Sequence, residues 1–340
     1  TLSAIPEGYW IGAMAEQMQI QLEVIDCPIC GIGESREVLR ARDLKLFCPG
    51  EFRLVACHRC GLIYMNPRPA AADMGRYYPA HYWAPPPPSE APPYLDAGMR
   101  RTLAALVRDY PGGRVLDVGC GIGRIPALMR ERGLQAMGLE PYEHACQIAR
   151  EHYGVEAVNA FLRDADLPEG SFDAVTMFDV LEHVHDPLGD LRQVHSLLRP
   201  GGALFVKVPN IASLQAELCG KWWYCLDIPR HLLHFSPRSL RQALKAAGFA
   251  RVNCAAVPDS VGALVFETTV VYRLRDWLLA RRGVEVAPAE GQTVGEVLEG
   301  EVYAGVPWQA KRVFRWLVRN VFYAPLAVEN LVGRSVELLA

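Results

Sequence analysis

The chain has 340 residues, of which 51% are hydrophobic, and a formal net charge of -3. This length holds one large core plus smaller modules. The slightly acidic balance excludes a general polyanion binder, because binding to phosphate backbones needs a concentrated basic surface, so nucleic acid is not an expected partner. No stretch approaches the roughly 20 apolar residues that span a bilayer, and residues 1–21 lack the basic start of a signal peptide. We therefore expect a cytoplasmic protein.

The first motif consists of two pairs of cysteines, each pair separated by two residues and followed at once by glycine. Two intervening residues let one turn place both sulfurs on the same ion. The spacing predicts a tetrahedral zinc site in a zinc-binding module over residues 21–68. Two disulfides fit a cytoplasmic protein less well, and thioredoxin-type redox chemistry does not need a second pair. The expected zinc ligands are Cys27, Cys30, Cys57 and Cys60.

Proline dominates the next segment, residues 69–95, which includes four consecutive prolines at 85–88. Proline removes backbone donors and favours extended polyproline II, so we expect a linker. An aromatic cluster lies inside it and either packs against the next domain or forms a flap over a cofactor. Its members are Tyr77, Tyr78, Tyr82 and Trp83.

Strand and helix patterns alternate over residues 96–257, which predicts a doubly wound parallel sheet with its ligands at the carboxyl ends of the strands. Strands are expected at 114–118, 135–140, 155–159, 172–178, 203–208 and 251–257. Helices are expected at 96–110, 124–132, 142–153, 187–198 and 237–247.

The closing strand of such a sheet is expected only at the chain end, in the apolar run 336–339 of a last segment, 334–340. Residues 258–333 then form a helical insertion between the sixth strand and an antiparallel seventh. Within the insertion, residues 308–322 alternate an apolar stripe with a basic face. Such a helix covers a substrate, forms a homodimer contact or lies peripherally on an anionic membrane.

The most specific segment, residues 115–124, is an apolar run that ends in three alternating glycines where a strand gives way to a helix. Glycine there allows positive φ and a close approach of a ligand to the backbone. A dinucleotide fingerprint needs a further glycine or alanine three residues on, but Arg124 and Pro126 stand at those places. The glycine spacing therefore excludes a dinucleotide site.

Two acidic residues accompany the glycines. Asp117 precedes the first glycine by two positions, and Glu140 ends the next expected strand. Together these features resemble motif I and the following acidic position of the class I S-adenosylmethionine (SAM)-dependent methyltransferases. The paired cysteines resemble the front end of a bacterial group of small-molecule and sugar methyltransferases within that class.

The resemblance implies a Rossmann-like α/β fold with seven strands, the last antiparallel, and SAM as cofactor. It implies that the glycine turn receives the carboxylate of SAM, that Asp117 holds water or the ammonium, and that Glu140 binds the ribose hydroxyls. The hydrophobic pair at 161–162 forms the adenine wall. The positions carried over for cofactor binding, with one aromatic from the flap, are Asp117, Gly119, Cys120, Gly121, Gly123, Glu140, Pro141, Phe161, Leu162, Phe178, Asp179 and Tyr82.

Three histidines compete as general base. His183 lies in the family's motif after strand four, and His231 and His234 lie in a loop, residues 227–237, that resembles one after strand five. A neutral imidazole suits proton transfer near pH 7. Methyl transfer also proceeds largely by proximity and alignment, so the reaction can do without a base.

We therefore predict SAM-dependent methyl transfer to a small or lipophilic, lipid-like acceptor, at oxygen. One alternative is carbon methylation of a nucleotide-linked sugar. Methylation of ribosomal or transfer RNA is disfavoured by the net charge and because residues 178–181 lack the Asn/Asp-Pro-Pro-aromatic signature of exocyclic amine methylation. A non-catalytic scaffold that docks on a membrane or partner is the last alternative.

Overall fold

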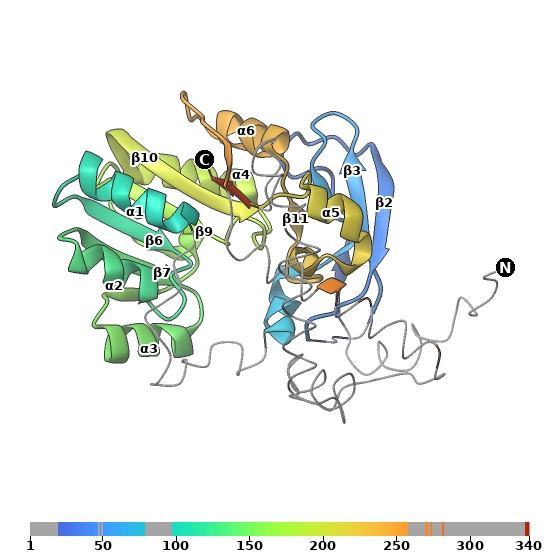
Figure 1. The fold of residues 1–340 in the computed structure, drawn as a ribbon, viewed down its shortest axis with the longest axis horizontal. Helices are drawn as coiled ribbons and strands as arrows, with labels where there is room; N and C mark the ends of the chain where they lie inside the picture. Colours follow the sequence, from blue (N-terminus) through green and yellow to red (C-terminus); the bar gives the residue numbers. More distant parts are fainter. Residues whose placement is uncertain are drawn as a thin grey trace.

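The computed structural model describes residues 20–46, 48, 50–78, 97–257, 269–270, 273, 281 and 337–339. Figure 1 shows two bodies side by side, a larger sheet flanked by helices and a smaller sheet near the N-terminal part of the described chain. Tyr82, the insertion helix 308–322 and most of the insertion lie outside the described residues. Among the described residues, no helix combines the length and apolar composition that a membrane crossing requires.

The larger sheet has seven strands in the order β12-β13-β10-β9-β6-β7-β8. Five neighbouring strands, from β10 to β8, run parallel, and β13 pairs antiparallel with both β10 and β12. This arrangement confirms the predicted Rossmann-like fold, including the antiparallel strand at the chain end. The strands are β6 (Arg114–Val118), β7 (Gln135–Glu140), β8 (Ala157–Asn159), β9 (Phe172–Phe178), β10 (Leu198–Pro209), β12 (Ala255–Val257) and β13 (Glu337–Leu339).

Helices cover both faces of this sheet, so its central strands are continuously apolar. Neighbouring residues of β6 point to opposite faces of the sheet. On one face Val115 packs with Leu106 and Met129, and on the other Leu116 belongs to a larger hydrophobic cluster that includes Leu191. All are nearly inaccessible to solvent. The helices are α1 (Ala97–Asp109), α2 (Arg124–Glu131), α3 (Glu143–Tyr153), α4 (Pro187–Leu197), α5 (Leu214–Cys219) and α6 (Pro237–Ala246).

Local sequence signals fix several helix ends. Asp186 caps α4 by accepting a hydrogen bond from the backbone N–H of Gly189 at 2.9 Å, and Ser236 forms a capping box with Ser239 at the start of α6. These caps, together with Pro187 at the start of α4, explain why the predicted helix boundaries agree with the structure to within a few residues.

The smaller sheet has the order β11-β4-β3-β2. Its edge strand β11 lies between β10 and α6 of the larger body in the sequence. It pairs with β4, Leu233 with Tyr64 and His234 with Ile63. The segments predicted as separate zinc and methyltransferase domains are therefore joined through one sheet. The strands are β1 (Leu22–Glu23), which pairs with β5 (Arg68–Pro69), and β2 (Ser35–Ala41), β3 (Phe52–Cys57), β4 (Ile63–Met65) and β11 (Leu233–His234).

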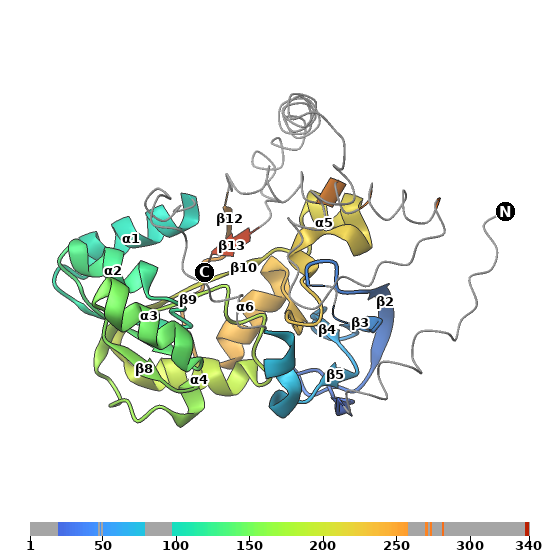
Figure 2. The same cartoon turned by 90° about the horizontal axis from the view of Figure 1, so that it is seen from below.

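Part of the predicted linker is folded. Residues Ala71–Tyr77 form the 3-10 helix η1, in which Met74 and Tyr77 are buried. In both views η1 (cyan) lies between the two bodies (Figures 1 and 2). Alanine at this point of the chain permits a helical turn that the later proline run would prevent. The other short helices are η3 (Leu162–Asp164), η4 (Gly220–Trp222) and η5 (Tyr224–Leu226).

Candidate active site

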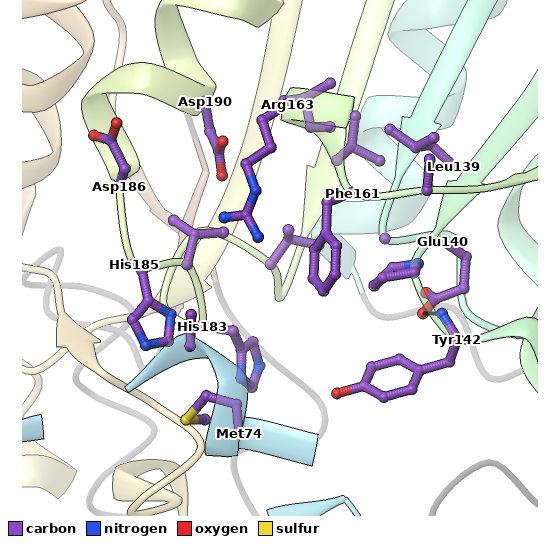
Figure 3. A pocket seen from close by; sticks show the side chains of 18 of the residues that line it. Met74, Leu139, Glu140, Tyr142, Phe161, Arg163, His183, His185, Asp186 and Asp190 are labelled. Carbon is purple, nitrogen blue, oxygen red and sulfur yellow. Dashed lines mark hydrogen bonds between the residues drawn. The ribbon is translucent and has the colours of Figure 1, made fainter. Parts of the chain in front are cut away.

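A pocket of about 830 Å³ opens at the carboxyl ends of β6, β7, β8 and β9, the edge at which ligands bind in parallel sheets. One wall comes from the segments that follow these strands. The opposite wall comes from η1 and Tyr78. The pocket therefore lies between the two bodies and takes residues from both. Figure 3 shows it with Glu140 and Tyr142 at one side and His183, His185, Asp186 and Asp190 at the other.

The glycine turn follows β6 as predicted. Gly119, with φ of 68°, lines the pocket, and a Cβ at this position would overlap the side chain of Val180. Its backbone N–H donates to the carbonyl of Leu139 at 2.7 Å. Gly123, with φ of 85°, has a different role, since a Cβ there would lie 2.7 Å from that of Ala149. Gly119 thus keeps the pocket floor open, while Gly123 allows α2 to approach α3.

Glu140 ends β7 and lines the pocket. It is only 2% exposed and accepts hydrogen bonds from the backbone N–H groups of Gly121, at 3.0 Å, and Tyr142, at 3.1 Å. Burial raises the pKa of Glu140 to about 7, while these two backbone donors act to lower it. The side chain is therefore fixed at this side of the pocket, where it can accept further hydrogen bonds from a ligand.

Asp117 is buried behind the turn and does not line the pocket. It accepts a hydrogen bond from the Thr176 hydroxyl on the neighbouring strand β9. Burial raises the pKa of Asp117 to about 7, the Thr176 bond lowers it, and the nearby Glu140 raises it further. The predicted contact of Asp117 with a ligand's ammonium stays a prediction.

The predicted adenine wall lies at the pocket. Leu162 is buried, and Phe161 is 51% exposed with the Arg163 guanidinium 4.8 Å from its ring centroid. Figure 3 shows the Phe161 ring pointing into the pocket between Arg163 and Glu140. An exposed phenyl face on a pocket wall is suited to stacking against a planar base.

The remaining predicted cofactor positions divide into two groups. Pro141 and Asp179 line the pocket, and Asp179 has a left-handed φ of 56° and a side chain 3.0 Å from the Lys207 ammonium. The other four described positions, Cys120, Gly121, Gly123 and Phe178, do not line the pocket. Cys120 instead packs beneath the turn, where its sulfur would collide with any Cβ at Gly138.

His183 is the one of the three candidate histidines that lines the pocket. Its Nδ1 lies 2.9 Å from the Tyr78 hydroxyl and 3.0 Å from the Arg230 carbonyl oxygen. His231 packs edge-on against it, with ring centroids 4.5 Å apart, and His234 lies farther back on β11 with Nε2 3.2 Å from the Leu226 carbonyl oxygen. The structure therefore gathers the three histidines and presents one of them to a ligand.

Burial lowers the pKa of each of these histidines. For His183, the charge of Asp227 and the carbonyl of Arg230 partly oppose this lowering of the pKa. For His231, the neighbouring His183 lowers the pKa further. The pKa of His234 falls to about 4. All three are therefore neutral near pH 7.

A buried ion cluster holds this histidine loop. Arg230 has no exposed surface and donates to both oxygens of Asp43, at 2.8 and 2.9 Å, and to Asp227 at 2.8 Å. Lys45 lies 2.6 Å from Asp227. Although burial acts to raise it, Lys45 and Arg230 hold the pKa of Asp227 well below its usual range. Since Asp43 and Lys45 belong to the N-terminal module, that module anchors the loop.

Sequence reasoning did not identify Asp43, Lys45 or the role of Tyr78, because only long-range contacts bring them to the site. The aromatic cluster was the one signal for Tyr78, but Tyr77 packs on the preceding N-terminal module and not on the next domain, and a flap over a cofactor stays a prediction. Tyr77 packs on Phe52, with ring centroids 6.2 Å apart, while Tyr78 lines the pocket.

The four predicted zinc ligands come together at one end of the N-terminal module. The Sγ atoms of Cys27 and Cys60 are 3.4 Å apart, as are those of Cys30 and Cys57, and all four lie within 4.8 Å of one another. The cysteines are free thiols, so the disulfide alternative is wrong for the described residues.

The backbone at the cysteines supports one shared ion. In each pair the glycine that follows donates back to the carbonyl of the first cysteine, Gly31 to Cys27 at 2.8 Å and Gly61 to Cys57 at 3.0 Å. Both glycines have positive φ. Four sulfurs on two matched turns fit a tetrahedral metal ion.

The parallel sheet with one antiparallel strand, the glycine turn after β6 and the acidic residue at the end of β7 define the class I SAM-dependent methyltransferases. Residues 93–253 match a family described as a methyltransferase domain. A ubiquinone biosynthesis O-methyltransferase from Idiomarina loihiensis is 30% identical over 189 residues, which cover 52% of this chain and 72% of that protein. The chain belongs to this methyltransferase family.

Other relatives match a shorter part. A ubiquinone biosynthesis O-methyltransferase from Xanthomonas campestris pv. campestris is 37% identical over 136 residues, 37% of this chain and 56% of that protein. The chain thus spans about half the length of these relatives. Among solved structures, a SAM-dependent methyltransferase from Mesorhizobium loti has a TM-score of 0.44 and 20% identity, over 72% of this chain and 96% of that one.

Proposed function

We propose that this protein transfers a methyl group from SAM to an oxygen of a small lipophilic acceptor. The observation that carries the proposal is a single pocket with the methyl-donor features, Gly119 and Glu140, on one side and His183 on the other. Proximity and alignment supply much of the rate of such a transfer, so one cavity that holds both substrates is the central requirement.

The donor side fits SAM, which supplies the methyl on a sulfonium when bound. Glu140 is fixed by two backbone donors and presents its carboxylate for the ribose hydroxyls. Gly119 leaves room for a close approach to the backbone, and the start of α2 has no side-chain cap, so its N–H groups are suited to the carboxylate of the cofactor. Phe161 and Leu162 form the adenine wall.

The acceptor side combines apolar walls with a polar end. Met74 of η1 and Val180 and Val184 of the loop after β9 supply apolar surface. Beside them, His183 presents an imidazole that is neutral near pH 7 and is the group we assign to contact the acceptor hydroxyl. The relatives named for ubiquinone biosynthesis O-methylation support oxygen as the methylated atom and an acceptor with an apolar part.

We also propose that the four cysteines hold one Zn²⁺ ion. The site lies within the module that supplies η1, Asp43 and Lys45 to the pocket region, so its role is structural. Thiolate ligation on two glycine-terminated turns supports zinc, which favours four sulfur ligands and needs no open position in a structural site. Homodimer formation and a peripheral membrane contact through residues 308–322 stay predictions.

The test begins with calorimetric titration of SAM into the purified protein, followed by incubation with methyl-labelled SAM and three sets of acceptors. The sets are lipophilic phenols and catechols, nucleotide-linked sugars, and RNA at physiological salt. A labelled methyl ether formed on an acceptor of the first set is the expected result. Label on a sugar carbon or in RNA replaces this proposal by the corresponding alternative, and the absence of SAM binding refutes methyl transfer altogether.

Substitution His183→Asn tests the acceptor side. Because proton handling contributes roughly 10²–10⁴-fold, kcat is expected to fall by that order while SAM affinity stays within a few fold. The matched control is His195→Asn, since His195 packs on Phe249 and does not line the pocket. Equal activities for the two variants would remove His183 from the mechanism.

A further inference from the structure

His185 is a further histidine of the pocket wall and lies two residues after His183, in the loop between β9 and α4. Figure 3 places it on the same side of the pocket as His183 and Asp190, away from Glu140. It follows the family motif that ends at Val184, so sequence reasoning did not single it out. The structure therefore adds a second imidazole to the acceptor side.

The ring proton of His185 is held on one nitrogen. Nε2 lies 3.0 Å from the Pro69 carbonyl oxygen, which only accepts hydrogen bonds, so Nε2 carries the proton and Nδ1 carries the lone pair. Burial lowers the pKa of His185, and the hydrogen bond to Pro69 only partly opposes this, so the ring is neutral near pH 7. Within the described part of the chain, no group donates a hydrogen bond to Nδ1. Nδ1 is thus the nitrogen through which the ring can accept a hydrogen bond from a ligand.

Both the backbone and the ring of His185 are held by β5. The Arg68 guanidinium donates to the His185 carbonyl oxygen at 2.8 Å and to Glu23 at 2.7 Å, and Pro69 accepts from the ring. The Arg68 side chain is only 9% exposed. Because these bonds fix the imidazole before a ligand arrives, a hydrogen bond to Nδ1 has a low ordering cost.

Asp190 is a second hydrogen-bond acceptor on this side. It lies in the first turn of α4 and lines the pocket, and its carboxyl makes no hydrogen bond or ion pair with any described residue. Burial and the neighbouring Asp186 raise the pKa of Asp190 to about 6, while Arg163 acts to lower it, so the group is mostly ionised at pH 7. Asp186 and Asp190 together outweigh the single positive charge of Arg163 in the wall.

A ligand group at this end of the pocket therefore has to supply the hydrogen-bond donor. An O–H or N–H can donate to Nδ1 of His185 or to Asp190. An ether displaces water and leaves these acceptors without a donor, which costs free energy. A carboxylate or phosphate also brings negative charge close to Asp186 and Asp190. The wall thus selects neutral or cationic donor groups.

We propose that His185 is a specificity-determining residue, whose Nδ1 accepts a hydrogen bond from a second hydroxyl or an ammonium group of the acceptor, and that Asp190 rejects anionic groups there. This role of His185 rests on the proposed function, because that function assigns the methylated hydroxyl to His183. An acceptor then needs two polar groups, one that is methylated and one that is only bound.

The experiment uses the full chain and four lipophilic phenols that differ only in a second substituent, which is hydroxymethyl, aminomethyl, methoxymethyl or carboxyl. The value of kcat/KM with SAM is measured for each phenol, and binding of each to the complex with S-adenosylhomocysteine is measured by calorimetry. The better of the hydroxymethyl and aminomethyl phenols is expected to exceed the methoxymethyl phenol at least about fivefold, the effect of one hydrogen bond. Which of the two is better identifies the class of the bound group.

Two substitutions separate this hydrogen bond from the fold. In His185→Gln the new amide nitrogen can replace Nε2 and keep the bond to Pro69, but the Nδ1 lone pair is lost, so the preference should fall to about twofold or less. In His185→Asn the amide oxygen lies near the place of Nδ1, and most of the preference should return. A general loss of activity changes all four phenols alike and cancels in the ratio.

A third substitution tests the selection by charge. Asp190→Asn is expected to raise kcat/KM for the carboxyl phenol at least about fivefold relative to the methoxymethyl phenol, because a charge repulsion is removed. The matched control is Asp166→Asn, since Asp166 is exposed and does not line the pocket, and it should leave that ratio unchanged.

Equal values for the hydroxymethyl, aminomethyl and methoxymethyl phenols in the native chain, or an unchanged preference in His185→Gln, would overturn the role of His185. A carboxyl phenol that reacts as well as the methoxymethyl phenol would overturn the selection by charge. Methylation of the phenols without any preference refutes this specificity alone. Calorimetric binding that shows the preference, without methyl transfer, refutes the proposed function alone, and the absence of binding of all four phenols refutes both.

Discussion

The two sides of the pocket are built in different ways. On the donor side, Gly119 and Glu140 are 21 positions apart in the sequence, at the ends of the adjacent parallel strands β6 and β7. On the acceptor side, Tyr78 meets His183 across 105 positions and Asp43 meets Arg230 across 187. The donor side is thus a product of one strand-turn-helix-strand unit. The acceptor side exists only while the N-terminal module is folded against the methyltransferase body.

The largest expected effect comes from disruption of the proposed zinc site by Cys57→Ser. Metal binding and folding of such modules are coupled, so η1 and the anchors Asp43 and Lys45 lose their positions. Methyl transfer is expected to fall at least about 100-fold, because misplacement by about 1 Å already costs that much. SAM affinity, measured by calorimetry, is expected to change only a few fold.

Cys254→Ser is the control, since Cys254 is half-buried and outside the cysteine cluster. If SAM affinity fell together with activity in Cys57→Ser, the two sides of the pocket would not be separable.

The second effect concerns the buried ion cluster. Asp43→Asn removes a charge partner from the fully buried Arg230, and breaking a buried pair costs about 3–5 kcal/mol of unfolding free energy. Urea unfolding measures it. Glu37→Gln, which breaks an exposed pair with Arg40, is the matched control and is expected to leave the unfolding free energy almost unchanged. Similar costs in the two variants would show that Asp43 does not anchor the histidine loop.

The third effect is confined to the donor side. Glu140→Gln removes a charged acceptor for ribose hydroxyls, and hydrogen bonds to charged groups contribute about 1.5–3 kcal/mol, or roughly 10–150-fold in SAM affinity. The KM for the acceptor is expected to stay unchanged. Glu143→Gln, on the surface of α3, serves as control. An equal rise of both KM values would contradict a donor-specific role.

The fourth effect is a pH dependence of cofactor binding. The folded pKa values of Asp117 and Glu140 are about 7, raised mainly by burial above 3.8 and 4.5. The folded chain therefore favours the protonated acids, and these groups reduce its stability as pH rises from about 4 to 7. A sulfonium and an ammonium favour the ionised acids, so the melting-temperature gain with SAM should be larger at pH 8 than at pH 6. A gain that is independent of pH would contradict this linkage.

The smallest effect is expected for Tyr78→Phe. The variant keeps the ring against Tyr142, at 5.5 Å between centroids, and loses only the hydroxyl 2.9 Å from His183 Nδ1. One hydrogen bond contributes about 0.5–1.5 kcal/mol, so kcat should fall by roughly 2- to 12-fold. Steady-state kinetics at saturating SAM measures it. A loss as large as that of His183→Asn would mean that Tyr78 acts on the acceptor directly.

Much of the fold followed from local pattern. The β6 run before the glycines, the capped helices α4 and α6, and the apolar strand at the chain end were each predictable, since strand period, caps and turns are local signals. The pairing of β11 with β4 was not. Two residues of a loop joined a sheet in which their partner strand β4 lies about 170 positions earlier, and no periodicity reports such a contact.

The same division holds within the site. The four cysteines and Glu140 carried spacing that predicted where they lie in the fold, while the three histidines looked alike in sequence. Only the packing of the loop after β9 against residues 230–234 decided that His183 faces the pocket and that His231 and His234 stand behind it.

By itself, therefore, the sequence determined the class of fold, the donor side and the four-cysteine site, because strand alternation, glycine spacing and ligand spacing act over a few residues to a few tens of residues. The tertiary structure decided the acceptor side. Its defining contacts, Tyr78 with His183 and Arg230 with Asp43, are set by how two separately patterned segments pack together. Side-chain burial and ion pairing at that interface depend on the assembled fold, and no local pattern encodes them.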